Sequence, residues 1–151
     1  MCGYCGCDSI GVIGRFMAEH VEIINATGVL RAAVTSADHT AVLDAKQTVA
    51  GLLWPHTEAE EVGLFRVLAT DATYTDIATL CAEHESLEEL LRGLTAGDTV
   101  AMSRFEHLLR EHINKEDNGL FPAAAVALYG PQWEEVDATT PAPRSPAPPR
   151  P

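Results

Sequence analysis

Apolar residues recur at intervals of three and four along most of the chain, which is the spacing of one face of an α-helix. Four segments show this pattern. Their apolar positions are Ile10, Ile13, Met17, Val21 and Ile24; then Val42, Val49, Leu52, Leu53, Leu64 and Val67; then Ile77, Leu80, Leu87, Leu91 and Leu94; then Phe105, Leu108, Leu120 and Ala123. The pattern predicts an all-α protein with four helices.

Capping and breaking residues set the expected helix boundaries. Candidate N-caps precede the first helix (Asp8 or Ser9), the second (Ser36 or Asp38) and the fourth (Asp98 or Thr99). The second helix should run to about Ala69, with a bend at Pro55. Pro122 should bend or divide the fourth helix before Gly130 ends it.

A duplication links the second and fourth helices. Residues 56–65 read HTEAEEVGLF and residues 112–121 read HINKEDNGLF, so both contain His-x3-Glu, a following acid and Gly-Leu-Phe. The tripeptide Ala-Glu-His stands upstream of each block, ending at His20 and at His84. Two helical hairpins of unequal length, packed as an up-down-up-down four-helix bundle, explain this arrangement better than a fixed-period solenoid.

The repeated residues carry the chemistry of metal ligands. Residues four apart share one face of a helix, so each His-x3-Glu pair can bind one metal centre. The inward-facing candidates are His20, His56, Glu60, His84, His112 and Glu116, whereas His39 and His107 lie off the apolar faces. Burying four imidazoles and two carboxylates without a cation would be costly. The pattern therefore predicts a di-metal site in the bundle core.

The type of ligand narrows the choice of metal. Imidazole with carboxylate and no thiolate suits iron, manganese or zinc, and we favour iron because histidine dominates. If Glu60 and Glu116 bridge two ions together with an oxo or hydroxo group, at least one coordination position stays open. Dioxygen, peroxide or nitric oxide could bind there.

Composition bounds the domain and its partners. The chain has 151 residues, 46% of them hydrophobic, which suffices for one core domain at residues 9–132. Residues 133–151 are rich in proline and alanine and are expected to form a disordered tail. A net charge of -12 disfavours nucleic acid and anionic membranes, and no apolar run reaches the ~20 residues of a membrane span. We expect a soluble, cytoplasmic protein.

The cysteines lie unevenly in the chain. Cys2, Cys5 and Cys7 fall in an N-terminal segment, residues 1–8, and Cys81 stands alone. This layout is poor for a disulfide framework and fits a reducing compartment. Three N-terminal cysteines fall one short of a closed zinc or iron–sulfur site, so a disordered terminus is the better interpretation. Cys81 is expected to be a packing residue.

The ordered motif set resembles the hemerythrin-like, or HHE cation-binding, family over about residues 10–130. It consists of a single His, His-x3-Glu-Glu, Glu-His, and His-x3-Glu-Asp followed by Gly-Leu-Phe-Pro. The resemblance implies a non-haem di-iron centre in a four-helix bundle. By position it implies the ligands His20, His56, Glu60, His84, His112 and Glu116. The family's roles range over dioxygen binding, oxygen or iron sensing, and handling of peroxide or nitric oxide.

Two positions differ from the oxygen-carrying members of that family. Their third helix carries His-x3-His, where this chain has His84-x3-Glu88. Glu88 could coordinate or relay protons, or it could face solvent on an acidic helix, which we favour. Their fourth helix carries His-x4-Asp, which would select Asp117, but helical phase and the repeat favour Glu116. Asp117 and Glu61 are then hydrogen-bonding partners of ligands or surface acids.

These differences weaken reversible oxygen carriage, because a more anionic site favours ferric iron. We predict a di-iron protein that binds or turns over a small oxidant, with catalase- or peroxidase-like detoxification first. The alternative is an oxygen, iron or redox sensor, or an oxygen carrier or store, without turnover. A third hypothesis is a bundle that binds adventitious metal or zinc without redox work. A tyrosine such as Tyr74 could also reach the iron.

Overall fold

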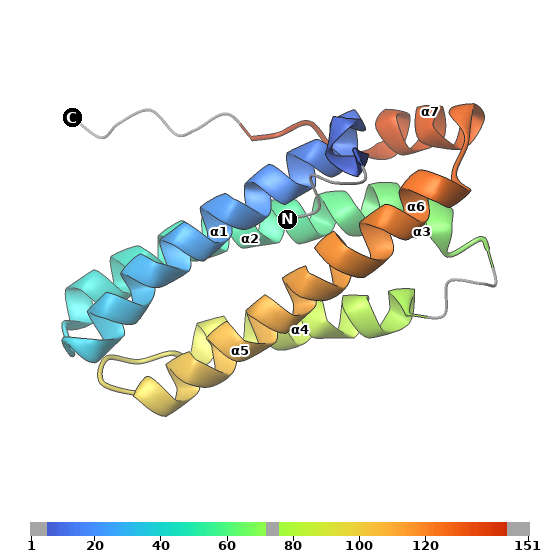
Figure 1. Ribbon diagram of the computed structural model, residues 1–151. Coiled ribbons are helices and arrows are strands. Elements are labelled where there is room, and N and C mark those ends of the chain that lie inside the picture. The colour runs from blue at the N-terminus through green and yellow to red at the C-terminus, as the bar shows by residue number, and fades with distance from the viewer. Residues whose placement is uncertain (1–5, 72–75, 145–151) are drawn as a thin grey trace.

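The computed structural model describes residues 6–71 and 76–144, and within these ranges every regular element is helical (Figure 1). The elements are η1 Cys7–Ser9, α1 Gly11–Thr35, α2 His39–Glu60, η2 Glu61–Phe65, α3 Arg66–Leu68, α4 Ile77–Gly93, α5 Thr99–Lys115, η3 Glu116–Leu120, α6 Phe121–Ala127 and α7 Gly130–Thr139. η1 is a 3₁₀ turn, and η2 and η3 are π-helical turns. The predicted all-α class is confirmed. None of the helices described here is both long and apolar enough to cross a lipid bilayer.

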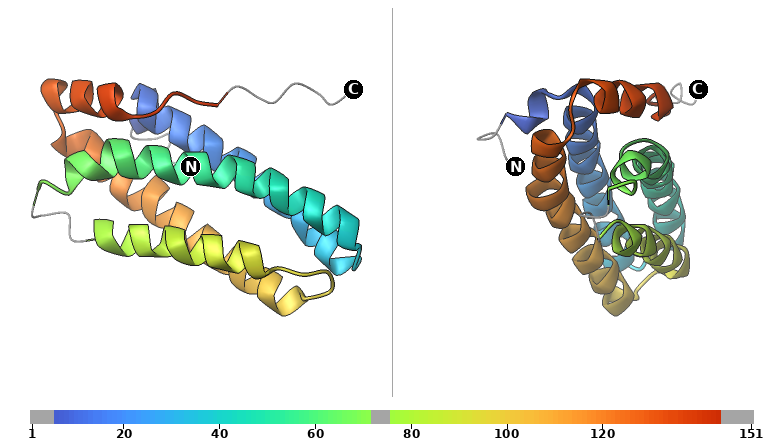
Figure 2. Two further views of the ribbon diagram at one scale, coloured as in Figure 1. Left: turned by 180° about the vertical axis from the view of Figure 1, so that it is seen from behind. Right: turned by 90° about the vertical axis from the view of Figure 1, so that its right-hand side faces the viewer.

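The long helices pack around a common interior. α1 contacts α2 and α5, and α4 contacts α5 and α2, so the contacts form a closed ring (Figure 2). The short helix α7 lies across one end, against η2 and α3. Side chains from all four long helices can therefore meet inside the ring.

Two aspartates begin helices as the sequence indicates. The Asp38 carboxylate accepts a hydrogen bond from the Ala41 N–H at 3.0 Å, and Asp98 accepts one from Ala101 at 3.0 Å. The predicted cap of the first helix is wrong. α1 begins at Gly11 after the 3₁₀ turn, and its N-cap residue Ile10 forms no side-chain cap.

The second and fourth helices are irregular at the repeated blocks rather than at the prolines. α2 passes through Pro55 as one helix, and the π-turn η2 follows it. The fourth helix is divided, as expected, but η3 makes the division ahead of Pro122. A π-turn holds more residues than an α-turn, so it rotates the helix face that follows. Ala124 is consequently buried, and Ala123, which uniform periodicity places inside, is exposed.

The C-terminal boundary also differs from the prediction. Residues 133–139 belong to α7 and are not a tail. Val136 is fully buried, and the Trp133 indole N–H donates to the Leu128 carbonyl at 3.1 Å. Burial of Val136 and this hydrogen bond hold α7 in place, although few residues of the segment are hydrophobic. Cys7 is buried in η1. Cys2, Cys5, Tyr74 and residues 145–151 lie outside the described residues.

Two apolar clusters fill the interior at opposite ends. The cluster beneath α7 contains Val12, Ile13, Phe16, Met17, Ala59, Leu64, Phe65, Val67, Leu68, Ile77, Leu80, Leu120, Phe121, Ala124, Leu128 and Val136. The other contains Ile23, Leu30, Ala33, Val34, Val42, Ala45, Val49, Ala50, Leu53, Leu87, Leu91, Leu94, Met102, Phe105, Leu109 and Ile113. Along the helices, the buried histidines and glutamates lie between these clusters, away from water.

Candidate metal centre

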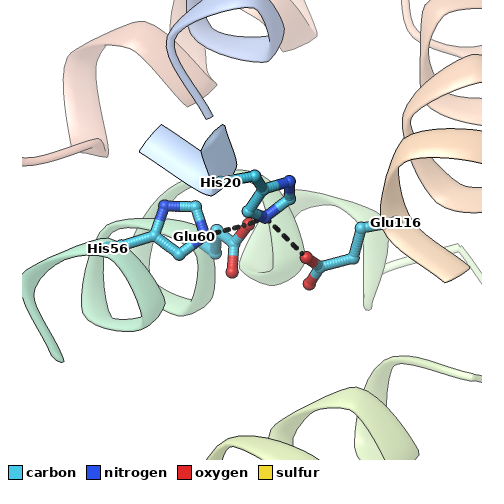
Figure 3. A group of neighbouring side chains, drawn as sticks. All are labelled: His20, His56, Glu60 and Glu116. Carbon is cyan, nitrogen blue, oxygen red and sulfur yellow. Dashed lines mark ion pairs between the residues drawn. The ribbon is translucent and has the colours of Figure 1, made fainter. Parts of the chain in front are cut away.

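The structure brings together the six side chains that the sequence singles out. α1 supplies His20, α2 supplies His56 and Glu60, α4 supplies His84, α5 supplies His112, and Glu116 begins η3. All six are buried. In Figure 3 the His20 ring points at both carboxylates, with its Nε2 3.1 Å from Glu116 Oε2 and 3.7 Å from Glu60 Oε1. We call these six residues the His/Glu cluster.

The His/Glu cluster divides into two groups that share both carboxylates. One group is His20, His56, Glu60 and Glu116, and the other is Glu60, His84, His112 and Glu116. The ligand atoms within each group lie within 4.8 Å of one another. His56 Nε2 lies 3.1 Å from Glu60 Oε1, and His112 Nε2 lies 3.0 Å from Glu116 Oε1. Each group offers two imidazole nitrogens and two carboxylate oxygens.

Several of these atoms lack hydrogen-bond partners although they are buried. Among the described residues they are His20 Nε2 and both carboxylate oxygens of Glu60 and of Glu116. The histidine Nε2 atoms lie close to these carboxylate oxygens, but the geometry of these pairs, distance and angle taken together, is not that of hydrogen bonds. Buried polar atoms without partners are costly, and a cation would take up their lone pairs. The donor set therefore fits a metal site.

The outward nitrogen of each clustered histidine meets a carboxylate. The Nδ1 atoms of His20, His56, His84 and His112 lie 2.8, 2.7, 2.7 and 2.8 Å from Asp117, Glu19, Glu61 and Glu83, respectively. An Nδ1–H that donates to a carboxylate leaves the Nε2 lone pair free to face inward. The same contact fixes the ring and makes its inner nitrogen more basic.

The π-turns connect the two halves of the repeat. Glu61 and Phe65, at the two ends of η2, both contact His84, whose ring stacks on Phe65 at a centroid distance of 5.6 Å. Asp117 lies in η3, and Phe121 directly follows that turn. They contact His20 in the same way, with Phe121 stacked on its ring at 5.8 Å. Each π-turn thus holds a histidine of the opposite half.

The charges inside the cluster stabilise one another in the metal-free protein. Burial opposes the charged form of His20, but its hydrogen bond to Asp117 and the nearby carboxylates of Glu116 and Glu60 raise its pKa to about 12. Burial likewise opposes the charged form of His84, but the nearby carboxylates of Glu116 and Glu60 raise its pKa to about 10.

Burial and the neighbouring Glu60 oppose ionisation of Glu116, yet the close imidazoles of the clustered histidines lower its pKa to about 2. Burial also opposes ionisation of Glu60, but the charge of His56 and the other close imidazoles hold its pKa well below the ordinary value. A metal ion entering the cluster therefore displaces protons from imidazoles that face ionised carboxylates.

Other sequence candidates do not join the cluster. Glu88 is partly exposed and pairs with Arg92 one turn along α4, as the solvent-facing interpretation expects. His39 is exposed, and so is His107, which lies 3.5 Å from Glu111. Cys81 is partly buried and belongs to neither group. Among the described residues the tyrosine is Tyr129, which is exposed on the surface.

Sequence reasoning missed the roles of Glu19 and Glu83. Both belong to the repeated Ala-Glu-His tripeptide, which was the available signal. Glu19 also accepts from Arg15 Nε at 2.7 Å, and Glu83 pairs with Lys115. Burial alone would raise the pKa of Glu19 and of Glu83, but the bonds to these cations and to the histidines lower both.

A narrow pocket reaches the cluster between α1, α2 and α5. Apolar side chains form most of its wall, and three clustered histidines form its inner end. The lining residues are His20, Ile23, Leu53, His56, Thr57, Leu109, His112 and Ile113. In this structure the pocket is too narrow to hold a water molecule.

Comparison with known proteins agrees with the geometry. The family model of the hemerythrin HHE cation-binding domain matches residues 12–124, a range that contains the whole His/Glu cluster. No curated protein and no solved structure matches the chain significantly. Because the family match covers most of its length, the chain belongs to the hemerythrin family of HHE cation-binding domains.

Proposed function

We propose that the His/Glu cluster holds two non-haem iron ions and that the protein consumes a small oxidant, hydrogen peroxide first, in a catalase- or peroxidase-like reaction. The carrying observation is the carboxylate paired with the outer nitrogen of each clustered histidine. With Glu60 and Glu116, six carboxylates surround the cluster. So much negative charge favours the ferric state over reversible oxygen binding. We also propose the up-down-up-down four-helix topology, which the ring of helix contacts supports.

Two ions follow from the way the donors are shared. Glu60 and Glu116 belong to both groups, and each group adds two histidines of its own. Four protein donors per ion leave part of an octahedral shell for a bridging group and an exogenous ligand. The mixed imidazole and carboxylate donors suit iron.

The protein's own groups would orient the metal and limit access to it. Bound iron would supply the redox chemistry, carrying the two electrons from one peroxide, oxidised to dioxygen, to a second peroxide. The second peroxide would take up the two protons that the first releases and be reduced to two waters. The Nδ1–carboxylate contacts hold each imidazole in place with its proton on the outer nitrogen. The pocket beside the cluster is narrower than a water molecule in this structure, so its wall limits access to the site.

Metal analysis and peroxide turnover test the proposal on protein purified without a metal-binding tag. We expect about two irons per chain, since the two groups provide two positions, together with absorption from iron bridged by oxygen. Added hydrogen peroxide should release dioxygen. His56→Ala should lower both iron content and turnover, and His107→Ala, which changes an exposed histidine, should alter neither.

The outcomes separate the hypotheses. Full iron content without dioxygen release, and without peroxide consumption in the presence of a reductant, would favour a sensor or carrier. Zinc or no metal in the cluster would contradict both the enzyme and the sensor.

A further inference from the structure

A groove on the outer face of α2 and α4 plays no part in the His/Glu cluster. It has a volume of about 510 Å³ and is lined by Leu43, Lys46, Gln47, Ala50, Gly51, Trp54, Pro55, Glu58, Leu91, Arg92 and Arg144. Trp54 is 38% exposed and Leu43 is 61% exposed, so the groove presents apolar surface to a ligand. The Arg92 guanidinium lies 5.8 Å from the centre of the Trp54 ring.

Contacts made by residues 140–144, which follow α7, place the chain beside this groove. After α7, Thr140 packs closely against Gly63, and the Pro141 carbonyl accepts a hydrogen bond from Arg15 Nη1 at 2.6 Å. Pro143 and Arg144 then line a hollow of about 390 Å³ beside His56 and Glu19. Gly51, Pro55 and Arg144 belong to this hollow and to the groove, so the two are continuous. The described chain thus reaches one edge of the groove at Arg144.

We propose that this groove binds the chain's own residues 145–151, in the manner of a module that recognises proline-rich peptides. The segment reads Ser-Pro-Ala-Pro-Pro-Arg-Pro and begins where Arg144 lies at the groove. Prolines pre-set the polyproline II conformation, so little conformational entropy is lost when such a segment docks. Aromatic-lined grooves bind such segments by packing proline rings on an exposed indole.

The length of the segment agrees with this occupant. Seven residues in polyproline II span roughly 22 Å, at 3.1 Å each. The helical path on α2 from Leu43 to Trp54 spans roughly 16 Å, at 1.5 Å per residue. The segment is thus long enough to cover the groove from its Arg144 edge.

Fluorescence of Trp54 tests the docking. Trp133→Phe leaves Trp54 as the one tryptophan of the chain. In that background, the full chain and a chain ending at Arg144 are compared at equal metal content. We expect acrylamide to quench Trp54 at least twofold more strongly in the shorter chain. The peptide Ser-Pro-Ala-Pro-Pro-Arg-Pro, added to the shorter chain, should restore protection in a saturable way.

Matched variants and peptides keep the test specific. Leu43→Ser should weaken peptide binding at least threefold. Val100→Ser, at a position that is 64% exposed on α5 and outside the groove, should leave binding unchanged. The peptide with glycine in place of each proline should not protect Trp54.

Three results would overturn the proposal. One is equal quenching of the two chains with no effect of the peptide. Another is protection by the glycine peptide equal to that of the proline peptide. The third is protection in the full chain that disappears on hundredfold dilution, because it would assign the groove to the tail of a second copy. None of these measurements requires peroxide turnover, so they test the groove independently of the proposed function.

Discussion

Residues 11–68 and 77–127 place equivalent groups around the His/Glu cluster, but their surroundings differ. Each half supplies a Glu-His pair from one helix and a His-x3-Glu pair from the next. Each half also has a π-turn, and an acid and a phenylalanine in or directly after that turn contact the histidine of the other half. Glu61 and Phe65 contact His84, and Asp117 and Phe121 contact His20. The inner donors and their immediate partners are thus duplicated as one unit.

The outer layers have diverged. Helix α7 covers η2, the π-turn of the first half, and Thr140 packs directly on Gly63. At Gly119, the matching residue of η3, an added Cβ would meet nothing within 4 Å. Glu61 and Asp117, which each contact a histidine of the other half, also differ in exposure. The Glu61 side chain is 42% exposed and that of Asp117 is 13% exposed. The two groups of the His/Glu cluster therefore have equal donors in unequal environments.

The largest effect should come from a residue that serves both halves. Glu60→Ala removes an oxygen donor from each group, so we expect nearly all metal to be lost from both positions. Metal analysis with a circular dichroism check of folding measures this. The control is Glu88→Ala, which changes a partly exposed glutamate of α4 outside the cluster and should keep full metal content. Retention of one ion per chain in Glu60→Ala would assign Glu60 to a single position.

Metal removal should expose a pH dependence in which the halves differ. The low pKa of Glu116 stabilises the metal-free fold above about pH 4.5, and this is lost as pH falls toward 2. The raised pKa of His20 stabilises the fold fully below about pH 6.5, and this declines as pH rises toward 12. We therefore expect metal-free protein to lose stability above pH 6.5.

The loaded protein should behave differently, because metal replaces those protons and binds more tightly as pH rises. Thermal unfolding of both forms between pH 5 and 9 measures this contrast. NMR titration of the metal-free form should show His84, with a pKa of about 10, losing its proton before His20. Parallel pH profiles for the two forms, or the reverse order of titration, would contradict the assignment.

Glu61 and Asp117, the acids that contact a histidine of the other half, should contribute unequally to metal affinity. Loss of a carboxylate behind a metal-bound histidine typically lowers metal affinity about 10- to 100-fold. We expect Asp117→Asn to fall in that range and Glu61→Gln to have a smaller effect, because solvent screens the more exposed side chain. Competition with a chelator measures both affinities, and Glu85→Gln, at an exposed position of α4, is the control. A larger loss in Glu61→Gln would reverse the proposed ranking.

The sequence predicted the converging residues because their chemistry recurs at helical spacing. His20, His56, His84 and His112 lie in apolar faces, and the repeat selected Glu116 over Asp117. All of them are buried in the same cluster apart from Asp117, which contacts His20 from outside. Local periodicity is sufficient for such residues, since it decides which side of a helix faces the interior.

Features that depend on distant packing could not be predicted in this way. The π-turns shift the helix face by a fraction of a turn, which is why Ala124 and not Ala123 is buried. The position of α7 depends on Val136 entering a core formed by other helices. The partner of Glu19 is likewise set by how α1 packs on α2, which brings its carboxylate to His56.

The smallest effect should separate the two glycines of the repeat. An added Cβ at Gly63 would overlap the Thr140 hydroxyl and lie 3.0 Å from its Cβ, so Gly63→Ala should cost about 1–3 kcal/mol of stability by overpacking. Gly119→Ala has open space and should be neutral or stabilising by up to about 1 kcal/mol, because alanine favours helical backbone. Urea denaturation measures both free energies of unfolding. Thr140→Gly should rescue Gly63→Ala in a double-mutant cycle if the contact between α7 and η2 is the cause. Equal effects of the two alanines, or a cycle with no coupling, would show that α7 does not distinguish the halves.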